Sequence, residues 1–115
     1  MTQSPEVLVH AKDVELEDRV REAIERRCEQ LADEFREATR FEISISEDGA
    51  GFQVQGHATG KNTDVATHAN ATEPGPAADL MLDKIAKQLR KLHDKRIFAQ
   101  RRDAQRDPPK RRNNT

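Results

Sequence analysis

The stretch that decides the fold is residues 79–96, DLMLDKIAKQLRKLHDKR, which contains neither Gly nor Pro. It is preceded by Pro74, Gly75 and Pro76, which are typical of a helix start. Apolar residues recur at spacings of three and four, the period of one helical face. They are Ala78, Met81, Leu82, Ile85, Leu89 and Leu92. The pattern predicts an amphipathic helix whose apolar face packs on a core.

The same helix carries a row of cations on a second face. At about 100° per residue, four lysines fall within roughly 80° of one another: Lys84, Lys87, Lys91 and Lys95. Arg90 and Arg96 flank this row. Such a row is commonly only a solvated surface, and we give this interpretation the same weight as the binding of a polyanion.

The net charge of −1 hides a division between two parts of the chain. From residue 79 to the end there are twelve Lys and Arg against five Asp and Glu, a net charge of +7. The first 78 residues carry eight basic and sixteen acidic residues, a net charge of −8. This asymmetry indicates an anionic partner for the C-terminal part.

The first 40 residues predict a strand followed by a long helix. Residues 6–11 alternate apolar and polar side chains, which favours a short strand. Residues 17–38 form an amphipathic helix in which one face is apolar and the other mostly acidic. The apolar face holds Leu16, Val20, Ile24, Cys28, Leu31 and Phe35.

Three further strands are predicted between the two helices. Residues 41–46, 52–58 and 63–70 alternate, and turn residues separate them. Short turns predict an antiparallel meander. The chain is therefore expected to be an α+β protein of order β-α-β-β-β-α, a small sheet with both helices packed on one face.

A chain of 115 residues is long enough for one domain and too short for two. We place it at residues 1–97, because the apolar period stops there. Residues 98–115 contain two Pro, six basic and two acidic residues, and they are predicted to be a disordered basic tail.

Catalysis has little support in the sequence. His10, His57, His68 and His93 are scattered and show no recognised metal-ligand spacing, so no metal site and no cofactor are predicted. Cys28, the single cysteine, lies on an apolar face and is expected to be a core side chain. We predict that the protein is not an enzyme. The lack of a signal peptide or an apolar span in this sequence favours a cytoplasmic location.

A nucleic-acid partner is better supported, because the positive charge is clustered on one helix. The chain has no Trp, no Tyr and only four Phe, which argues against the stacking of splayed bases. The composition fits recognition of the shape and phosphates of folded RNA. Two alternatives stay open: a general folded-RNA-binding stress protein, and an adaptor that binds a basic protein through the acidic first helix.

Several segments together resemble the ribosome hibernation-promoting factor family, which includes ribosome-associated inhibitor A. The helical segments are LEDRVREAIERRCEQLADEF at 16–35 and PAADLMLDKIAKQLRKLHDKR at 76–96. The strand segments are GFQVQGHATG at 51–60 and DVATHANATE at 64–73, which look like the central hairpin of that family. The resemblance covers residues 6–96.

The resemblance implies a fold similar to a double-stranded-RNA-binding domain. It also implies a stress-response factor, monomeric off the ribosome, that binds the small ribosomal subunit and its rRNA near the tRNA and mRNA channel and inhibits translation. No membrane or small-molecule substrate is implied. The rRNA-binding residues carried over from the family are Arg26, Arg27, Lys84, Lys87, Arg90, Lys91, Lys95 and Arg96.

Overall fold

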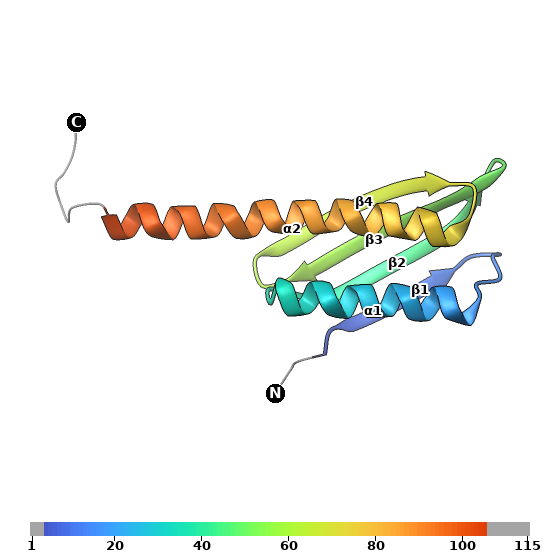
Figure 1. Cartoon of the computed structure of the whole chain (residues 1–115), viewed down its shortest axis with the longest axis horizontal. Helices are drawn as coiled ribbons and strands as arrows, with labels where there is room; N and C mark the ends of the chain where they lie inside the picture. Colours follow the sequence, from blue (N-terminus) through green and yellow to red (C-terminus); the bar gives the residue numbers. More distant parts are fainter. Residues whose placement is uncertain (1–3, 106–115) are drawn as a thin grey trace.

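The computed structural model describes the backbone of residues 4–105 and the side chains as far as residue 97. The elements follow the predicted order β-α-β-β-β-α (Figure 1). The helices are α1 (Asp18–Glu34) and α2 (Pro74–Gln105). The strands are β1 (Glu6–Ala11), β2 (Ala38–Asp48), β3 (Gly51–Gly60) and β4 (Thr63–Ala71).

The four strands form one sheet in the order β1-β2-β3-β4. The antiparallel pairing of β2 with β3 and of β3 with β4 confirms the predicted meander. β1 pairs parallel to β2, because helix α1 carries the chain back across the sheet between them. Both helices cover the same face, and the other face is open (Figure 1).

The core lies between that helix-covered face and the two helices. The predicted apolar face of α2 is buried at Ala78, Met81, Leu82, Ile85 and Leu89, and Leu92 is partly buried. The alternate side chains of the sheet face it, including Phe41, Ile43, Ile45 and Val54, which are fully buried. The core residues of α1 are Ile24, Cys28 and Leu31, with Phe35 at its end.

Gly56 in β3 allows α2 to lie close to the sheet. A Cβ atom at this position would lie 2.9 Å from Ile85 Cδ1 and would collide with Met81 Sδ. Both Met81 and Ile85 are fully buried and have little room to move. Helix α2 therefore packs against β3 at Gly56, where the strand has no side chain in the way.

The two edge strands are each contacted by a cation from the helix above. Arg21 of α1 donates a hydrogen bond to the backbone oxygen of Val9 in β1, at 3.2 Å. Lys84 of α2 donates one to the backbone oxygen of His68 in β4, at 2.8 Å. Each helix is thus tied to the sheet edge it covers.

Helix α2 is longer than the sequence prediction at both ends. It begins at Pro74. Proline is tolerated there because it lacks a backbone N–H, and the N–H groups of the first helical turn have no partner within the helix. It continues to Gln105, so residues 98–105, predicted to be disordered, are helical. Ala, Gln and Arg are strong helix formers and no Pro occurs between Pro76 and Pro108, which explains the extension. The rest of the predicted basic tail, residues 106–115, lies outside the described residues.

Helix α1 is shorter than predicted. It ends at Glu34 rather than at residue 38, since the Phe35 N–H closes the last turn on the Leu31 carbonyl and Ala38 already belongs to β2. The buried side chains of Phe35 and Ala38 hold this tight helix-to-strand connection in the core.

Two leucines of α2 provide a matched test of this packing. Leu89→Ala should lower the free energy of unfolding by about 2–5 kcal/mol, because Leu89 is buried. Leu80→Ala should change it by about 0.5 kcal/mol or less, since Leu80 is 49% exposed. Urea denaturation measures both variants. Equal losses at the two positions would contradict the orientation of α2.

Candidate nucleic-acid interface

The four lysines of the predicted row are all exposed along one side of α2. Lys84, Lys87, Lys91 and Lys95 are hereafter called the lysine row. Leu80, one turn before Lys84, extends the same side as an exposed apolar residue. Since the apolar face of α2 is fixed on the sheet, the row is held outward by the core packing.

An open groove of about 290 Å³ separates the lysine row from the edge strand β4. Its helix side consists of Lys84, Lys87, Gln88 and Lys91. Its strand side consists of Ala66, Thr67 and His68. These seven residues are hereafter called the lysine groove, and none of them carries a carboxylate. Three ammonium groups converging without an opposing negative charge make the groove suited to an anion.

Two hydrogen bonds fix the walls of the lysine groove. Besides the bond from Lys84 to His68, Thr67 Oγ1 donates to the backbone oxygen of Met81 at 3.1 Å. Thr67 thus joins the middle of β4 to α2 beneath the groove. The spacing between helix and strand, and with it the spacing between lysines and strand, is set by the fold.

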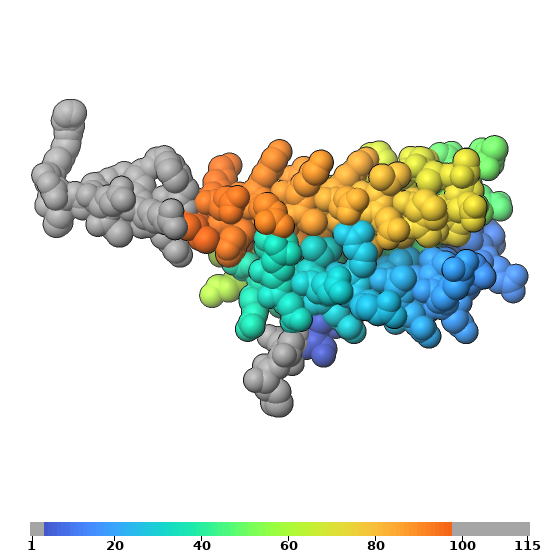
Figure 2. Space-filling view, viewed as in Figure 1, coloured from blue at the N-terminus to red at the C-terminus, as the bar shows by residue number. Residues whose placement is uncertain are grey.

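Two predicted arginines, Arg27 of α1 and Arg90 of α2, join the two helices on the other side of α2. Arg27 Nη2 lies 3.0 Å from Asp83 Oδ1, and Arg27 Nη1 lies 3.6 Å from Asp79 Oδ1. Arg90 Nη2 lies 2.9 Å from Glu34 Oε2, with its guanidinium 5.7 Å from the centre of the Phe35 ring. Figure 2 shows the two helices side by side along this seam.

The remaining two predicted arginines are also outside the lysine groove. Arg96 lies 3.5 Å from Glu37 and donates to the backbone oxygen of Asn62 in the β3–β4 turn. Arg26 is exposed on α1. The structure therefore gathers the lysines of the predicted site but distributes its arginines, three of which pair with carboxylates of the protein itself.

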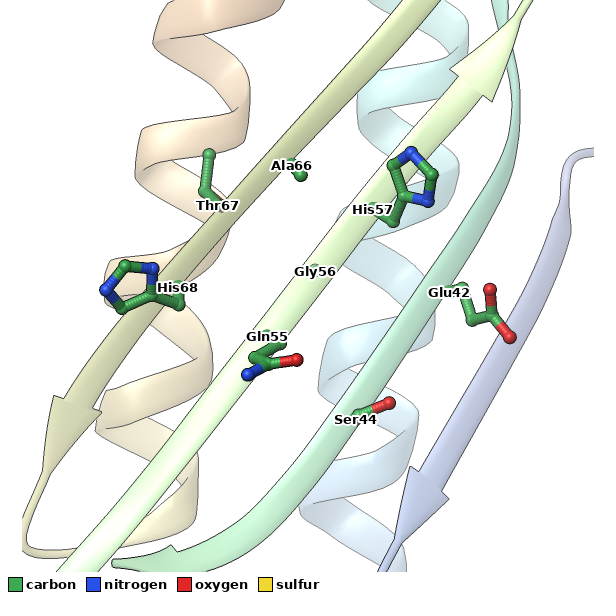
Figure 3. Close-up of a pocket in the computed structure, with 8 residues that line it drawn as sticks. All are labelled: Glu42, Ser44, Gln55, Gly56, His57, Ala66, Thr67 and His68. Atoms are coloured by element: carbon green, nitrogen blue, oxygen red, sulfur yellow. The ribbon is translucent and has the colours of Figure 1, made fainter.

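The open face of the sheet contains a second concave surface that the sequence prediction did not include. This hollow has a volume of about 370 Å³ (Figure 3). From β2 and β3 it is lined by Glu42, Ser44, Gln55, Gly56 and His57. From β4 it is lined by Ala66, Thr67 and His68, the same three residues that line the lysine groove. These eight residues are hereafter called the sheet hollow. The alternation of polar residues in the strands was the available signal for it.

Two of the four histidines pair with carboxylates on the open sheet face. His57 Nε2 lies 2.5 Å from Asp64 Oδ1, and His10 lies 3.7 Å from Glu42, both on the open sheet face. Among residues 4–97, no group of three or more His, Cys, Asp or Glu could hold a metal ion. Within the part of the chain that the structure describes, neither helix is long and apolar enough to cross a bilayer.

The chain matches a known protein family. Residues 7–97 match the family described as Sigma 54 modulation protein / S30EA ribosomal protein. The chain belongs to this family. Membership in the S30EA family confirms the resemblance to ribosome hibernation-promoting factors. The match runs from β1 into α2 and includes every residue of the predicted site.

Solved structures of the same fold support the assignment. A ribosomal subunit interface protein from Coxiella burnetii is similar with a TM-score of 0.71 at 16% identity, covering 77% of this chain and 98% of that one. The N-terminal domain of Protein Y from Thermus thermophilus is similar with a TM-score of 0.66 at 16% identity, with the same coverage. No curated protein sequence matches the chain significantly. At such identities the structures show a shared fold.

The buried thiol of Cys28 provides a test of the core in this S30EA-family fold. Burial raises the pKa of Cys28 from 9.0 to about 12. The stability that comes from keeping the thiol protonated is therefore complete below about pH 9 and is lost as the pH rises toward about 12. Cys28→Ala should remove this part of the pH dependence, as measured by denaturation of both proteins across this range.

Thiol labelling gives an independent readout. At about pH 8 the native protein should react with a thiol reagent only as fast as it opens, because the thiolate is the nucleophile. The denatured chain should react at once. Rapid labelling of the native protein would contradict the burial of Cys28.

Proposed function

We propose that the protein is a ribosome hibernation factor that inhibits translation. In this proposal it binds the small ribosomal subunit near the tRNA and mRNA channel, through α2 and in the cytoplasm. Membership in the S30EA family indicates a ribosome-associated factor. The observation that carries the choice of surface is the lysine groove, which offers three ammonium groups and no carboxylate.

The lysine row has the dimensions and chemistry of a phosphate-binding surface. From Lys84 to Lys95 it spans about 16 Å at 1.5 Å per residue, enough to follow several nucleotides of an RNA strand. Lysine contacts phosphate as a point charge and needs no fixed geometry, so the row suits a backbone whose sequence is not read. Such contacts position RNA and supply affinity.

The arginines contribute differently in this proposal. Arg27 and Arg90 are engaged with carboxylates across the seam between α1 and α2, where they hold the helix that carries the lysine row. Arg26 is exposed and can contact phosphate directly. Arg96 joins the turn between β3 and β4 to α2. We therefore expect the lysines to dominate the electrostatic part of binding.

The salt dependence of binding tests the lysine row. Replacing all four lysines with Gln should lower affinity for small ribosomal subunits. It should also reduce the slope of log K against log salt by roughly 0.7–0.9 per lysine in contact, because each neutralised phosphate releases counterions. Gln keeps helix propensity and an N–H donor for the His68 carbonyl, so folding should hold. Sedimentation at several salt concentrations measures the slope.

A matched control removes charge from α1. Glu22→Gln, Glu25→Gln, Glu29→Gln and Asp33→Asn change four side chains that form no ion pair among residues 4–97. Binding should stay the same or become tighter, since repulsion from RNA falls. If the lysine variant keeps the wild-type slope while this control loses binding, the acidic helix is the contact surface and the partner is a basic protein.

Co-sedimentation from stationary-phase cells separates the remaining alternative. A ribosomal factor should travel with ribosomal particles in a sucrose gradient, and the four-lysine variant should shift to the free-protein fractions. A wild-type protein found only in the free fractions, yet binding folded RNA with the expected salt slope, would instead be a general RNA-binding protein.

A further inference from the structure

The lysine groove and the sheet hollow are separated only by the edge strand β4. Ala66, Thr67 and His68 line both concave surfaces. His68 is exposed on the open sheet face, and its backbone oxygen faces Lys84 on the helix side. Ala66, whose side chain is only a methyl group, lies between Gln55 and His57 of β3 and the outer edge of β4 (Figure 3). The two surfaces therefore lie next to each other along β4 and share three of its residues.

The two surfaces differ in chemistry. The lysine groove has three cations, whereas the sheet hollow has no Lys or Arg and contains the carboxylate of Glu42. A phosphate would be repelled there. Ser44 and Gln55 instead present neutral donors and acceptors, His68 adds the two nitrogens of its ring, and all three side chains are exposed. His57 is occupied by Asp64 on the same face.

Neutral hydrogen-bonding groups of this kind match the uncharged parts of a nucleotide. The edges of RNA bases and the ribose 2′-hydroxyl both donate and accept hydrogen bonds. A volume of about 370 Å³ lies within the range of small-ligand sites, enough for part of a nucleotide. No Phe lines the hollow, so the imidazole rings of His57 and His68 are its only aromatic groups, and hydrogen bonds would supply most of the binding there.

We infer that a single-stranded RNA segment crosses the edge of the sheet at β4. Its phosphates lie on the lysine groove, and its riboses and bases lie in the sheet hollow. Ser44, Gln55 and His68 are the residues that distinguish RNA from DNA by hydrogen bonding. This inference rests on the proposed function and extends it, because it adds a neutral, ribose-reading surface to the cationic helix.

The direct test replaces the hydrogen-bonding groups of the hollow. The double variant Ser44→Ala, Gln55→Ala should weaken binding of a short single-stranded RNA oligonucleotide by about 3- to 10-fold, the loss of one or two neutral hydrogen bonds. The salt slope should be unchanged, since no cation is removed. Wild-type protein should prefer RNA over DNA of the same sequence, and the variant should lose most of this preference.

The controls separate the two surfaces. Gln30→Ala removes the same amide from an exposed position of α1 and should leave binding unchanged. Ala66→Leu should weaken RNA binding by placing a larger side chain where the two surfaces meet. Because Ser44, Gln55 and Ala66 are exposed, melting temperatures should change little.

The outcomes distinguish this inference from the proposed function. Wild-type affinity in the double variant, or equal binding of RNA and DNA by the wild-type protein, would overturn the role of the hollow while leaving the lysine row in place. An unchanged salt slope in the four-lysine variant would overturn the proposed function itself. A lower slope in that variant, with an altered RNA preference in the double variant, supports both.

Discussion

The packing of α2 on β3 and β4 is the interaction on which the rest of the structure depends. Met81 and Ile85 lie against Gly56, where the missing side chain allows the helix to approach the sheet. This contact fixes both the distance between α2 and the sheet and the rotation of α2 about its own axis. The lysines are rotated by about 90° or more around the helix axis from the buried face. The packing that fixes the buried face therefore also places the lysines beside β4. The electrostatic surface follows from the shape of the core.

The charge distribution is organised by the two helices. Glu34 of α1 pairs across the seam with Arg90 of α2. Arg27 makes the converse contact with Asp83 of α2. The planar guanidinium group of arginine suits such ion pairs with carboxylates. The lysines of α2 instead lie on the side of the helix that faces the lysine groove. The result is a protein of nearly zero net charge with a locally cationic surface.

Periodicity was sufficient to predict most of the fold. The spacing from Ala78 to Leu89 predicted which face of α2 is buried, and the alternation at Phe41, Ile43 and Ile45 predicted the inward face of β2. The end of α2 was misplaced, because the loss of apolar residues after the core does not end a helix that propensity can continue. Which cations are paired could not be predicted, since Arg27 meets Asp83, 56 positions away, only after folding. The sheet hollow arises in the same way, from three strands brought side by side.

The contacts at the two outer strands have a consequence for how the protein behaves at high concentration. An unpaired strand edge is a template on which another chain can add, and many sheets carry a charged side chain to prevent it. Here the carbonyls of Val9 and His68 are already occupied by Arg21 and Lys84. Lys84 therefore belongs to the lysine row and at the same time occupies a backbone acceptor of the edge strand β4. Loss of that single ammonium group would leave the His68 carbonyl free to pair with another chain.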